Sequence, residues 1–290
     1  MKKFLAVLLA VLMVFAICSC EKKVDEQQSE NEETENVVDA PEENAEEAGE
    51  EAGDDAGEEA GEDETPAENS TITMATNAYF KPYEFYEGDK IVGIDAEIAE
   101  EIAKKLGKEL VIEDMEFSTI ITAVQEGSVD FGMAGMTVTE ERKESVDFSS
   151  SYANGVQSII VKEDSPITSV DDLYADGASY KVGVQLGTTG DIYSTDDFGE
   201  DNVIQYSKGN EAVLALVGGS VDCVIIDDEP AKALVAENEG LKILDTSYAD
   251  EDYAICVAKG NGDLLAAINA AIDELTLDGT IDAIVAKYIK

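Results

Sequence analysis

From residue 71 onward the chain alternates between strand-like and helix-like segments, and this alternation constrains the fold more than any other feature of the sequence. Residues 71–76 have the composition of a strand. Residues 95–106 place their isoleucines on one helical face before a glycine ends the helix, and residues 109–113 return to a strand-like pattern. Regular alternation of this kind indicates an α/β architecture with largely parallel sheets.

The alternation forms two cycles of roughly 100 residues each, which predicts two similar lobes with a cleft between them. Thr139 is expected to cap a helix that carries Arg142 in its first turn, and Asp228 is the better candidate to cap a later helix. The other expected elements are a strand or loop over 130–135, strands over 181–185, 221–226 and 253–258, helices over 119–126, 211–217 and 229–237, a helix beginning near 188, and two C-terminal helices.

Residues 21–70 do not continue this pattern. They contain 22 acidic residues against two lysines, and residues 46–61 repeat an acidic-acidic-Ala-Gly unit four times. A segment with so few apolar residues cannot bury enough surface to offset the entropy of ordering it, and its like charges repel. We therefore expect a disordered acidic tether. The alternative, a calcium-binding tail, lacks the glycine geometry of a calcium loop.

The first 20 residues have the features of an export signal. A lysine pair precedes an apolar run of about 14 residues, which is too short to span a bilayer comfortably. The run ends in Ile17-Cys18-Ser19-Cys20, which is similar to the lipobox of bacterial lipoproteins with Cys20 as the lipidated residue. Cys18 is unusual at its position in that pattern, and an ordinary secretory signal cut near Ser19 is the alternative.

Cysteine and histidine usage limits the chemistry of the chain. There is no histidine and no cysteine spacing typical of a zinc site, so we expect neither a metal nor a cofactor. The two remaining cysteines, Cys223 and Cys256, lie in separate apolar, strand-like runs. They form either a disulfide, which an exported protein permits, or two buried thiols.

Residues 71–290 carry 15 basic against 43 acidic residues, a net charge of −28. Nucleic-acid binding is therefore disfavoured, because contacts to phosphate need a basic surface.

Against this acidic background Arg142 is the only arginine of the chain. A guanidinium pairs with a carboxylate through two parallel hydrogen bonds, and small and hydroxyl residues surround Arg142 in the sequence. The pattern is typical of a site for a small carboxylate ligand, and a surface arginine in a first helical turn is the alternative.

Six motifs then carry a resemblance to a known family. In order they are A-T-N-A-Y-F-K-P-Y-E-F from residue 75, G-D-K-I-V-G-I-D from 88, M-E-F-S-T-I-I-T-A-V-Q-E-G-S-V-D from 115, M-T-V-T-E-E-R-K-E-S-V-D-F-S from 136, V-G-V-Q-L-G-T-T-G from 182 and V-D-C-V-I-I-D-D-E-P-A from 221. Together they make residues 71–290 similar to the polar amino-acid solute-binding proteins of ABC importers, extracellular solute-binding family 3, which includes the glutamine- and histidine-binding proteins.

The resemblance implies a two-lobed fold of the type II periplasmic-binding-protein class, with two parallel-rich sheets joined by two hinge crossovers. Lobe 1 would comprise residues 71–153 and 252–290, and lobe 2 residues 154–251. The hinges would lie near residues 152–156 and 249–253. A ligand that contacts both lobes binds the closed state better than the open one, and this difference shifts the population towards closure.

The resemblance also assigns roles to residues. Arg142 aligns with the arginine that pairs with the ligand's α-carboxylate, and Asp227 with the carboxylate that receives the α-ammonium; we expect Asp227 to be ionised at neutral pH in the empty cleft. The other assigned positions are the groups beside the α-carboxylate (Thr137, the backbone of Gly135, Thr188 and Thr189), the aromatic walls (Phe80 and Phe117, with Tyr83 nearby) and the far end of the ligand (Asn77 and Gln185).

Each assignment has a structural alternative. The aromatic side chains could belong to the core, the threonines could be strand or cap hydroxyls, and Asp227 could cap the helix that follows it. The order and spacing of the motifs favour the ligand-binding interpretation, most strongly for Arg142 and Asp227. Asn77 and Gln185 are less certain candidates, because residues at the far end of a ligand depend on the substrate.

The function implied is capture of a polar amino acid by a monomer without catalytic residues, which delivers it to the membrane permease subunits of an ABC transporter. The protein would be extracytoplasmic and held at the outer face of the cell membrane by a lipid on Cys20. Asn77 weakens a lysine or arginine assignment, because some relatives that bind cationic side chains have aspartate there. The net charge of −28 would attract cations. Gln185 and Asn77 together favour a polar neutral amino acid.

Two other classes of protein use such a fold. An enzyme similar to the cyclohexadienyl dehydratases would need a positioned general acid, and without histidine only Asp, Glu, Tyr or Lys could serve. Asp227 lies in the motif for the amino group, which favours binding over catalysis. A sensor domain of a signalling protein is typically joined to a transmembrane segment and an output module, and neither follows Tyr253 in this sequence.

Overall fold

The computed structural model describes residues 70–289, which belong to one compact unit, Glu62–Lys290. The predicted signal peptide, the predicted lipidation site at Cys20 and residues 21–69 of the predicted tether lie outside the described residues. Within residues 70–289, no helix is both long enough and apolar enough to cross a membrane.

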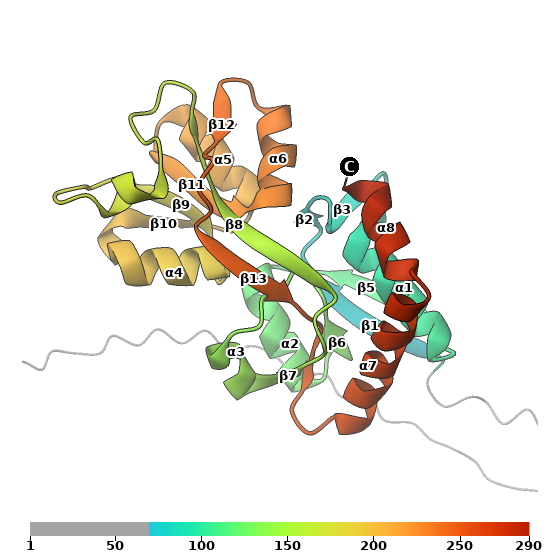
Figure 1. Cartoon of the computed structure of the whole chain (residues 1–290). Helices are drawn as coiled ribbons and strands as arrows, with labels where there is room; N and C mark the ends of the chain where they lie inside the picture. The colour runs from blue at the N-terminus through green and yellow to red at the C-terminus, as the bar shows by residue number, and fades with distance from the viewer. Residues whose placement is uncertain (1–69, 290) are drawn as a thin grey trace, which may run out of the picture. The chain divides into compact units, whose positions relative to one another are not determined.

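The described residues form two sheet-containing lobes (Figure 1). Lobe 1 combines segments from both ends of the described chain. Its strands are β1 (Thr71–Thr76), β2 (Tyr79–Phe80), β3 (Glu84–Glu87), β4 (Lys90–Val92), β5 (Glu109–Asp114), β6 (Phe131–Gly132), β7 (Val146–Phe148) and β14 (Cys256–Ala258). Its helices are α1 (Ile94–Lys105), the 3₁₀ helix η1 (Phe117–Thr119), α2 (Ile120–Glu126), α3 (Glu140–Ser145), α7 (Gly262–Leu277) and α8 (Thr280–Tyr288).

Lobe 2 is formed by the middle of the chain. Its strands are β8 (Ala153–Lys162), β9 (Val182–Gln185), β10 (Val203–Tyr206), β11 (Cys223–Asp227), β12 (Leu241–Ile243) and β13 (Ala249–Tyr253). Its helices are α4 (Thr189–Phe198), α5 (Gly209–Gly218) and α6 (Asp228–Glu237), with the short 3₁₀ helices η2 (Val170–Tyr174) and η3 (Glu200–Asn202).

Each lobe is built on a mixed sheet. The order in lobe 1 is β5-β1-β6-β14-β7, and the order in lobe 2 is β10-β9-β11-β8-β12, with β13 also paired to β8. The pairs β5-β1-β6 and β10-β9-β11 are parallel, as expected for strands joined by helical crossovers. β8 in lobe 2 and β14 in lobe 1 pair antiparallel with their neighbours. The predicted α/β class with two sheet-containing lobes is confirmed.

The apolar runs of the sequence are explained by sheets covered on both faces. In β11, Cys223 and Ile225 belong to one hydrophobic cluster, whereas Val224 and Ile226 belong to another that includes α5 and α6. Side chains of a strand alternate between its two faces, so a strand buried on both reads as a continuous apolar run. In lobe 1, α1, α7 and α8 cover one face of the sheet and α2 covers the other.

Two predictions made from local sequence patterns are confirmed. Strand β1 has its predicted bounds, and Thr139 caps α3 by accepting a hydrogen bond from the backbone N–H of Arg142 at 3.1 Å. The predicted cap of α6 was wrong. Asp227 rather than Asp228 has the extended backbone of a cap residue, and its Oδ1 accepts from the Glu229 N–H at 3.1 Å.

Two other expectations needed correction. The predicted strand over 253–258 is two strands, because the chain leaves β13 in one sheet at Tyr253 and enters β14 in the other at Cys256. Cys223 and Cys256 are free, buried thiols in different hydrophobic clusters, so the disulfide alternative was wrong. Burial raises the pKa of each thiol to about 12, which makes both unreactive.

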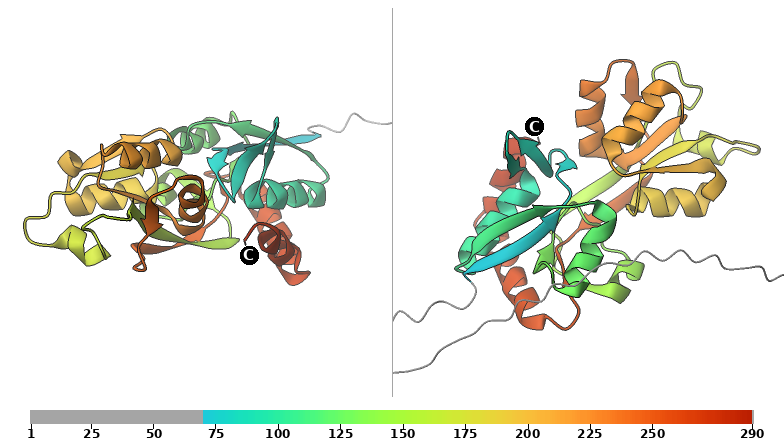
Figure 2. Two further views of the ribbon diagram at one scale, coloured as in Figure 1. Left: turned by 90° about the horizontal axis from the view of Figure 1, so that it is seen from above. Right: turned by 180° about the vertical axis from the view of Figure 1, so that it is seen from behind.

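The lobes are connected through an antiparallel pair formed by the two expected hinge segments. Ala153 lies opposite Tyr253 and Gln157 lies opposite Ala249, so β8 and β13 run side by side from one lobe to the other (Figure 2). Gly155 lies in the middle of this pair. A Cβ added there would lie 2.4 Å from the Cζ and Oη atoms of Tyr253. The crossover therefore leaves no space for a side chain at this position.

We predict that Gly155→Ala destabilises the protein by about 1–3 kcal/mol, the usual cost of overpacking a filled site. The control is Gly218→Ala, at the end of α5, where an added Cβ meets no atom within 4 Å and an alanine should be neutral or slightly stabilising. Urea titration followed by circular dichroism measures both. Equal unfolding midpoints for the two variants would contradict the close packing of the crossover.

Candidate functional site

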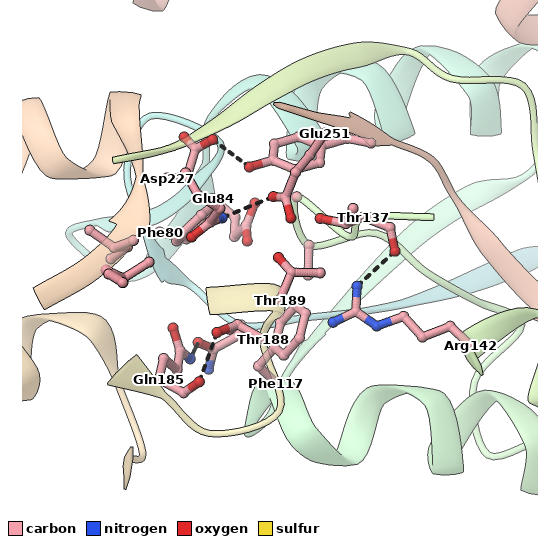
Figure 3. A pocket seen from close by; sticks show the side chains of 17 residues that line it. Phe80, Glu84, Phe117, Thr137, Arg142, Gln185, Thr188, Thr189, Asp227 and Glu251 are labelled. Atoms are coloured by element: carbon pink, nitrogen blue, oxygen red, sulfur yellow. Dashed lines mark hydrogen bonds between the residues drawn. The ribbon is translucent and has the colours of Figure 1, made fainter. Parts of the chain in front are cut away.

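A pocket lies between the two lobes. Its empty volume, counting the part open to solvent, is about 450 Å³. Both lobes and the crossover strands line it (Figure 3). The lining residues are Asn77, Phe80, Glu84, Phe117, Ala134, Gly135, Thr137 and Arg142 from lobe 1, Gln185, Thr188, Thr189, Ile225, Ile226 and Asp227 from lobe 2, and Gln157, Glu251 and Tyr253 from β8 and β13.

The structure brings together all the site residues predicted from the sequence except Tyr83. That side chain is buried behind the pocket wall. Its ring stacks on Phe80 with 5.7 Å between centroids, and it meets Tyr253 edge-on at 5.3 Å. Tyr83 therefore supports the aromatic wall rather than forming part of it.

Arg142 is buried at the boundary between the lobes. Its Nη1 donates to the Thr137 carbonyl at 2.7 Å, and its Nη2 donates across the cleft to the Gly187 carbonyl at 3.0 Å. The guanidinium carbon lies 5.4 Å from the centre of the Phe117 ring. Burial lowers the pKa of Arg142, but an arginine side chain stays charged. Both partners are backbone carbonyls, so most of its five N–H donors remain available for a carboxylate.

Asp227 is buried on the lobe 2 side of the pocket. Its Oδ2 accepts from the Val156 N–H at 3.1 Å and from the Tyr253 hydroxyl at 2.5 Å. Burial, the largest effect, raises the pKa of Asp227 to about 7 although these hydrogen bonds act to lower it. The pKa of Asp227 therefore lies close to neutral pH, so the carboxyl is ionised less completely in the empty pocket than the sequence analysis expected. A bound ammonium would favour its ionised form.

Glu84, which lines the pocket, forms a buried carboxyl pair with Asp95 behind it. Both are 0% exposed, and Asp95 Oδ2 accepts from the Gly135 N–H and the Tyr152 hydroxyl, each at 2.8 Å. Burial and the nearby Asp95 hold the pKa of Glu84 well above its usual range, and burial raises the pKa of Asp95 to about 6. At neutral pH Glu84 therefore keeps its proton and Asp95 carries the charge.

This pair determines what Gly135 offers to a ligand. Gly135 has a φ of +53°, and an added Cβ would lie 2.8 Å from Phe80 Cε1. Because its N–H already donates to Asp95, the carbonyl is the backbone group it can present to the pocket. A carbonyl accepts hydrogen bonds, so Gly135 suits an ammonium rather than the carboxylate beside which the family resemblance placed it.

The two threonines that line the pocket from lobe 2, Thr188 and Thr189, have different roles. The Thr188 hydroxyl caps α4, because it accepts from the Asp191 N–H at 3.3 Å and donates to the Gln185 carbonyl at 2.8 Å. Thr189 begins the helix and lies buried in the pocket wall. The helix N-terminus thus faces the pocket, where its free N–H groups favour an anion.

The far end of the pocket is a pair of amides that joins the lobes. Gln185 Nε2 donates to Asn77 Oδ1 at 2.9 Å and to the Ser207 carbonyl at 3.1 Å, and Asn77 Nδ2 donates to the Met115 carbonyl at 2.7 Å. Both hydrogens of the Gln185 amide are thus used within the protein. The Gln185 oxygen and the second lone pair of the Asn77 oxygen can therefore accept from a ligand, and one hydrogen of the Asn77 amide remains as a donor.

The sequence analysis missed part of the pocket. Four of the missed residues lie within the quoted motifs or within two residues of one, but the sequence analysis assigned them no role: Glu84, Ala134, Ile225 and Ile226. Glu251 and Tyr253 lie in residues 249–253, which were expected to form a hinge, and Gln157 lies one residue beyond the other expected hinge, 152–156. Within residues 70–289 there is no group of three or more Cys, Asp or Glu side chains that could hold a metal ion.

Comparison with known proteins gives a consistent picture. Residues 72–290 match the family of bacterial extracellular solute-binding proteins, family 3. The arginine-binding extracellular protein ArtP of Bacillus subtilis is 32% identical over 226 residues, covering 75% of this chain and 85% of ArtP. The glutamine-binding protein GlnH of the same species is 34% identical over 204 residues, covering 69% and 74%. A solved ancestral arginine-binding protein bound to arginine is 40% identical, with a TM-score of 0.71, and covers 77% of this chain and 99% of its own.

Glu84 gives a prediction about the pH dependence of stability. The folded protein keeps a proton on Glu84 that the unfolded chain releases above its ordinary pKa of 4.5, so this group makes wild type lose stability as the pH rises above that value. Glu84→Gln removes the effect. The stability of the variant relative to wild type should therefore increase from pH 5 to pH 7, by at most about 1.4 kcal/mol per pH unit.

Thermal unfolding at several pH values measures this difference. Glu87→Gln, at an exposed position on the same strand, is the control and should follow wild type. If the Glu84 and Glu87 variants show the same pH dependence as wild type, Glu84 does not retain its proton in the folded state.

Proposed function

The chain belongs to the bacterial extracellular solute-binding proteins of family 3, and on that premise we propose that it captures a single amino acid in its interlobe pocket and delivers it to the permease subunits of an ABC importer. The observation that carries the proposal is the separation of charge in the pocket. Arg142 lies at one side, bound only to backbone carbonyls, and the buried carboxyl of Asp227 lies at another. A zwitterion is the small molecule that satisfies both groups at once.

The backbone groups support the same orientation. The α-carboxylate would lie between Arg142 and the N-terminus of α4, where Thr189 begins the helix. The α-ammonium would lie near Asp227 and the carbonyl of Gly135, which can only accept. Because Arg142 belongs to lobe 1 and α4 and Asp227 belong to lobe 2, a ligand in this orientation binds both lobes and favours closure.

The hydrogen-bonding groups at the far end of the pocket limit which ligand side chains can bind there. The amide hydrogens of Gln185 are used within the protein, so the pair of Gln185 and Asn77 offers mainly acceptors. We therefore favour a side chain that ends in N–H donors, either the guanidinium of arginine or the carboxamide of glutamine. Phe80 and Phe117 would pack against the planar faces of either group. This widens the preference for a polar neutral side chain to include the cationic side chain of arginine, and it agrees with the relatives named for binding arginine and glutamine.

One observation favours an enzyme on the same fold. Glu84 lines the pocket and keeps its proton at neutral pH, so it could act as a general acid in a dehydration. The relatives, however, are named as an arginine-binding extracellular protein and as the glutamine-binding protein of an ABC transporter. Incubation of wild type with prephenate or arogenate, followed by product analysis, separates the two proposals. Turnover that disappears in Glu84→Gln while substrate binding persists would establish the enzyme.

Isothermal titration with a panel of amino acids tests the binding proposal, and Arg142→Lys tests its central residue. We predict that wild type binds arginine or glutamine and that Arg142→Lys loses about 2–5 kcal/mol of binding free energy. Lysine keeps the charge but cannot form two parallel hydrogen bonds with a carboxylate. Lys143→Arg, on the exposed side of the same helix, is the control. An Arg142→Lys affinity within about threefold of wild type would remove Arg142 from the ligand site.

We also propose that the protein is extracytoplasmic and anchored to the outer face of the cell membrane through a lipid on Cys20. In that case Cys20→Ala should move the protein from the membrane fraction to the soluble fraction, because the residue that carries the lipid is lost. Cys18→Ala, two residues away, should leave it in the membrane fraction. Unchanged partitioning of Cys20→Ala, with an unmodified N-terminal peptide in mass spectrometry, would contradict the anchor.

A further inference from the structure

Glu251 is a buried carboxyl that lines the pocket from the crossover strand β13. It is 6% exposed, and its Oε2 accepts from Gln157 Nε2 at 2.9 Å. Its other oxygen, Oε1, is buried and receives no hydrogen bond from the described protein, and the same is true of Gln157 Oε1. In Figure 3 the side chain projects from its strand into the space between Asp227 and Thr137. The hinge side of the pocket therefore presents acceptors that lack donors.

Asp227, the residue that the family resemblance assigns to the ammonium, is in the opposite situation. It already accepts from the Val156 N–H, the Tyr253 hydroxyl and the Glu229 N–H. A carboxylate has about four sites for accepting hydrogen bonds, so little capacity is left. An ammonium brings three N–H donors, and Asp227 alone cannot receive them.

Buried oxygens without a donor are unfavourable, and a ligand that supplies the donor removes that cost. The charged groups near Glu251 favour a positively charged ligand group beside it. Asp227 and Glu251 face the same side of the pocket, and the negative charge of Glu251 raises the pKa of Asp227. Arg142 is the positive group near them, and it also experiences the charge of Glu251. Once the ligand's carboxylate binds Arg142, the two acidic residues require a positive partner.

We propose that Glu251 receives the α-ammonium of the ligand together with Asp227, and that this contact makes the protein specific for a protonated amine. The inference rests on the proposed function, since it takes the ligand to be an amino acid. It also gives the hinge a direct part in recognition. Glu251 and Gln157 lie on the two strands that join the lobes, so the ligand's amine completes a hydrogen-bonded network across β8 and β13.

The test compares Glu251→Gln with Asp250→Asn, an exposed position next to it on the same strand with the same change of charge. The probes are L-arginine and L-glutamine and their deamino analogues, 5-guanidinopentanoate and 4-carbamoylbutanoate. Titration calorimetry should show that Glu251→Gln weakens binding of the preferred amino acid by at least about tenfold, because a buried ammonium loses a charged partner. The affinity for the deamino analogue should stay within about threefold, and Asp250→Asn should change neither.

A purely structural role for Glu251 would weaken both ligands equally, and that result would overturn the inference, as would equal affinities for Glu251→Gln and Asp250→Asn. Thermal unfolding without ligand checks that the variant is folded. If it is not, Glu251→Met supplies a second variant, for which the same selective loss is expected. Absence of amino-acid binding in wild type would overturn the proposed function itself, so the two failures are distinguishable.

Discussion

The structure depends on a single buried guanidinium between two lobes that carry an excess of acidic groups. The Arg142 guanidinium donates to a backbone carbonyl of each lobe, that of Thr137 and that of Gly187. Three carboxyl groups line the same pocket, those of Glu84, Asp227 and Glu251. Burial keeps Glu84 protonated and leaves Asp227 near its midpoint at pH 7. A zwitterion reduces the electrostatic cost of this arrangement, because it supplies an anion to the arginine and a cation to the acids.

Two of the contacts that cross the cleft outside the pocket are weak. Outside the pocket, the contacts across the cleft include an exposed ion pair between Lys81 and Glu237 at 3.8 Å and a cation–π contact of Lys208 with the Tyr79 ring at 3.4 Å. Exposed ion pairs contribute about 0–1 kcal/mol, and an exposed cation–π contact contributes about as much. A ligand that binds both lobes can therefore shift the equilibrium between open and closed states, provided that the crossover strands allow the movement.

The fold class, two helix starts and most of the pocket residues could be predicted from the sequence, because each depends on a local pattern or on ordered motifs. Alternating patterns predicted the α/β class, capping residues placed Thr139 and Thr188 at helix starts, and ordered motifs brought together ten of the eleven proposed positions in one pocket. What failed depends on tertiary structure. Glu251 lies in one expected hinge and Gln157 directly follows the other, and their place in the pocket depends on the pairing of β8 with β13, which no local pattern predicts. The protonation of Asp227 likewise follows from burial, which no local pattern reports.

The most direct test of the central claim is a crystal structure of residues 70–290 grown with arginine or glutamine. The account predicts electron density for one amino acid between the lobes, with its α-carboxylate oxygens about 3 Å from the Arg142 guanidinium nitrogens. Its α-ammonium should lie at a similar distance from an oxygen of Asp227 and from Glu251 Oε1. An amino acid bound outside the cleft, or bound with its α-carboxylate away from Arg142, would contradict the account.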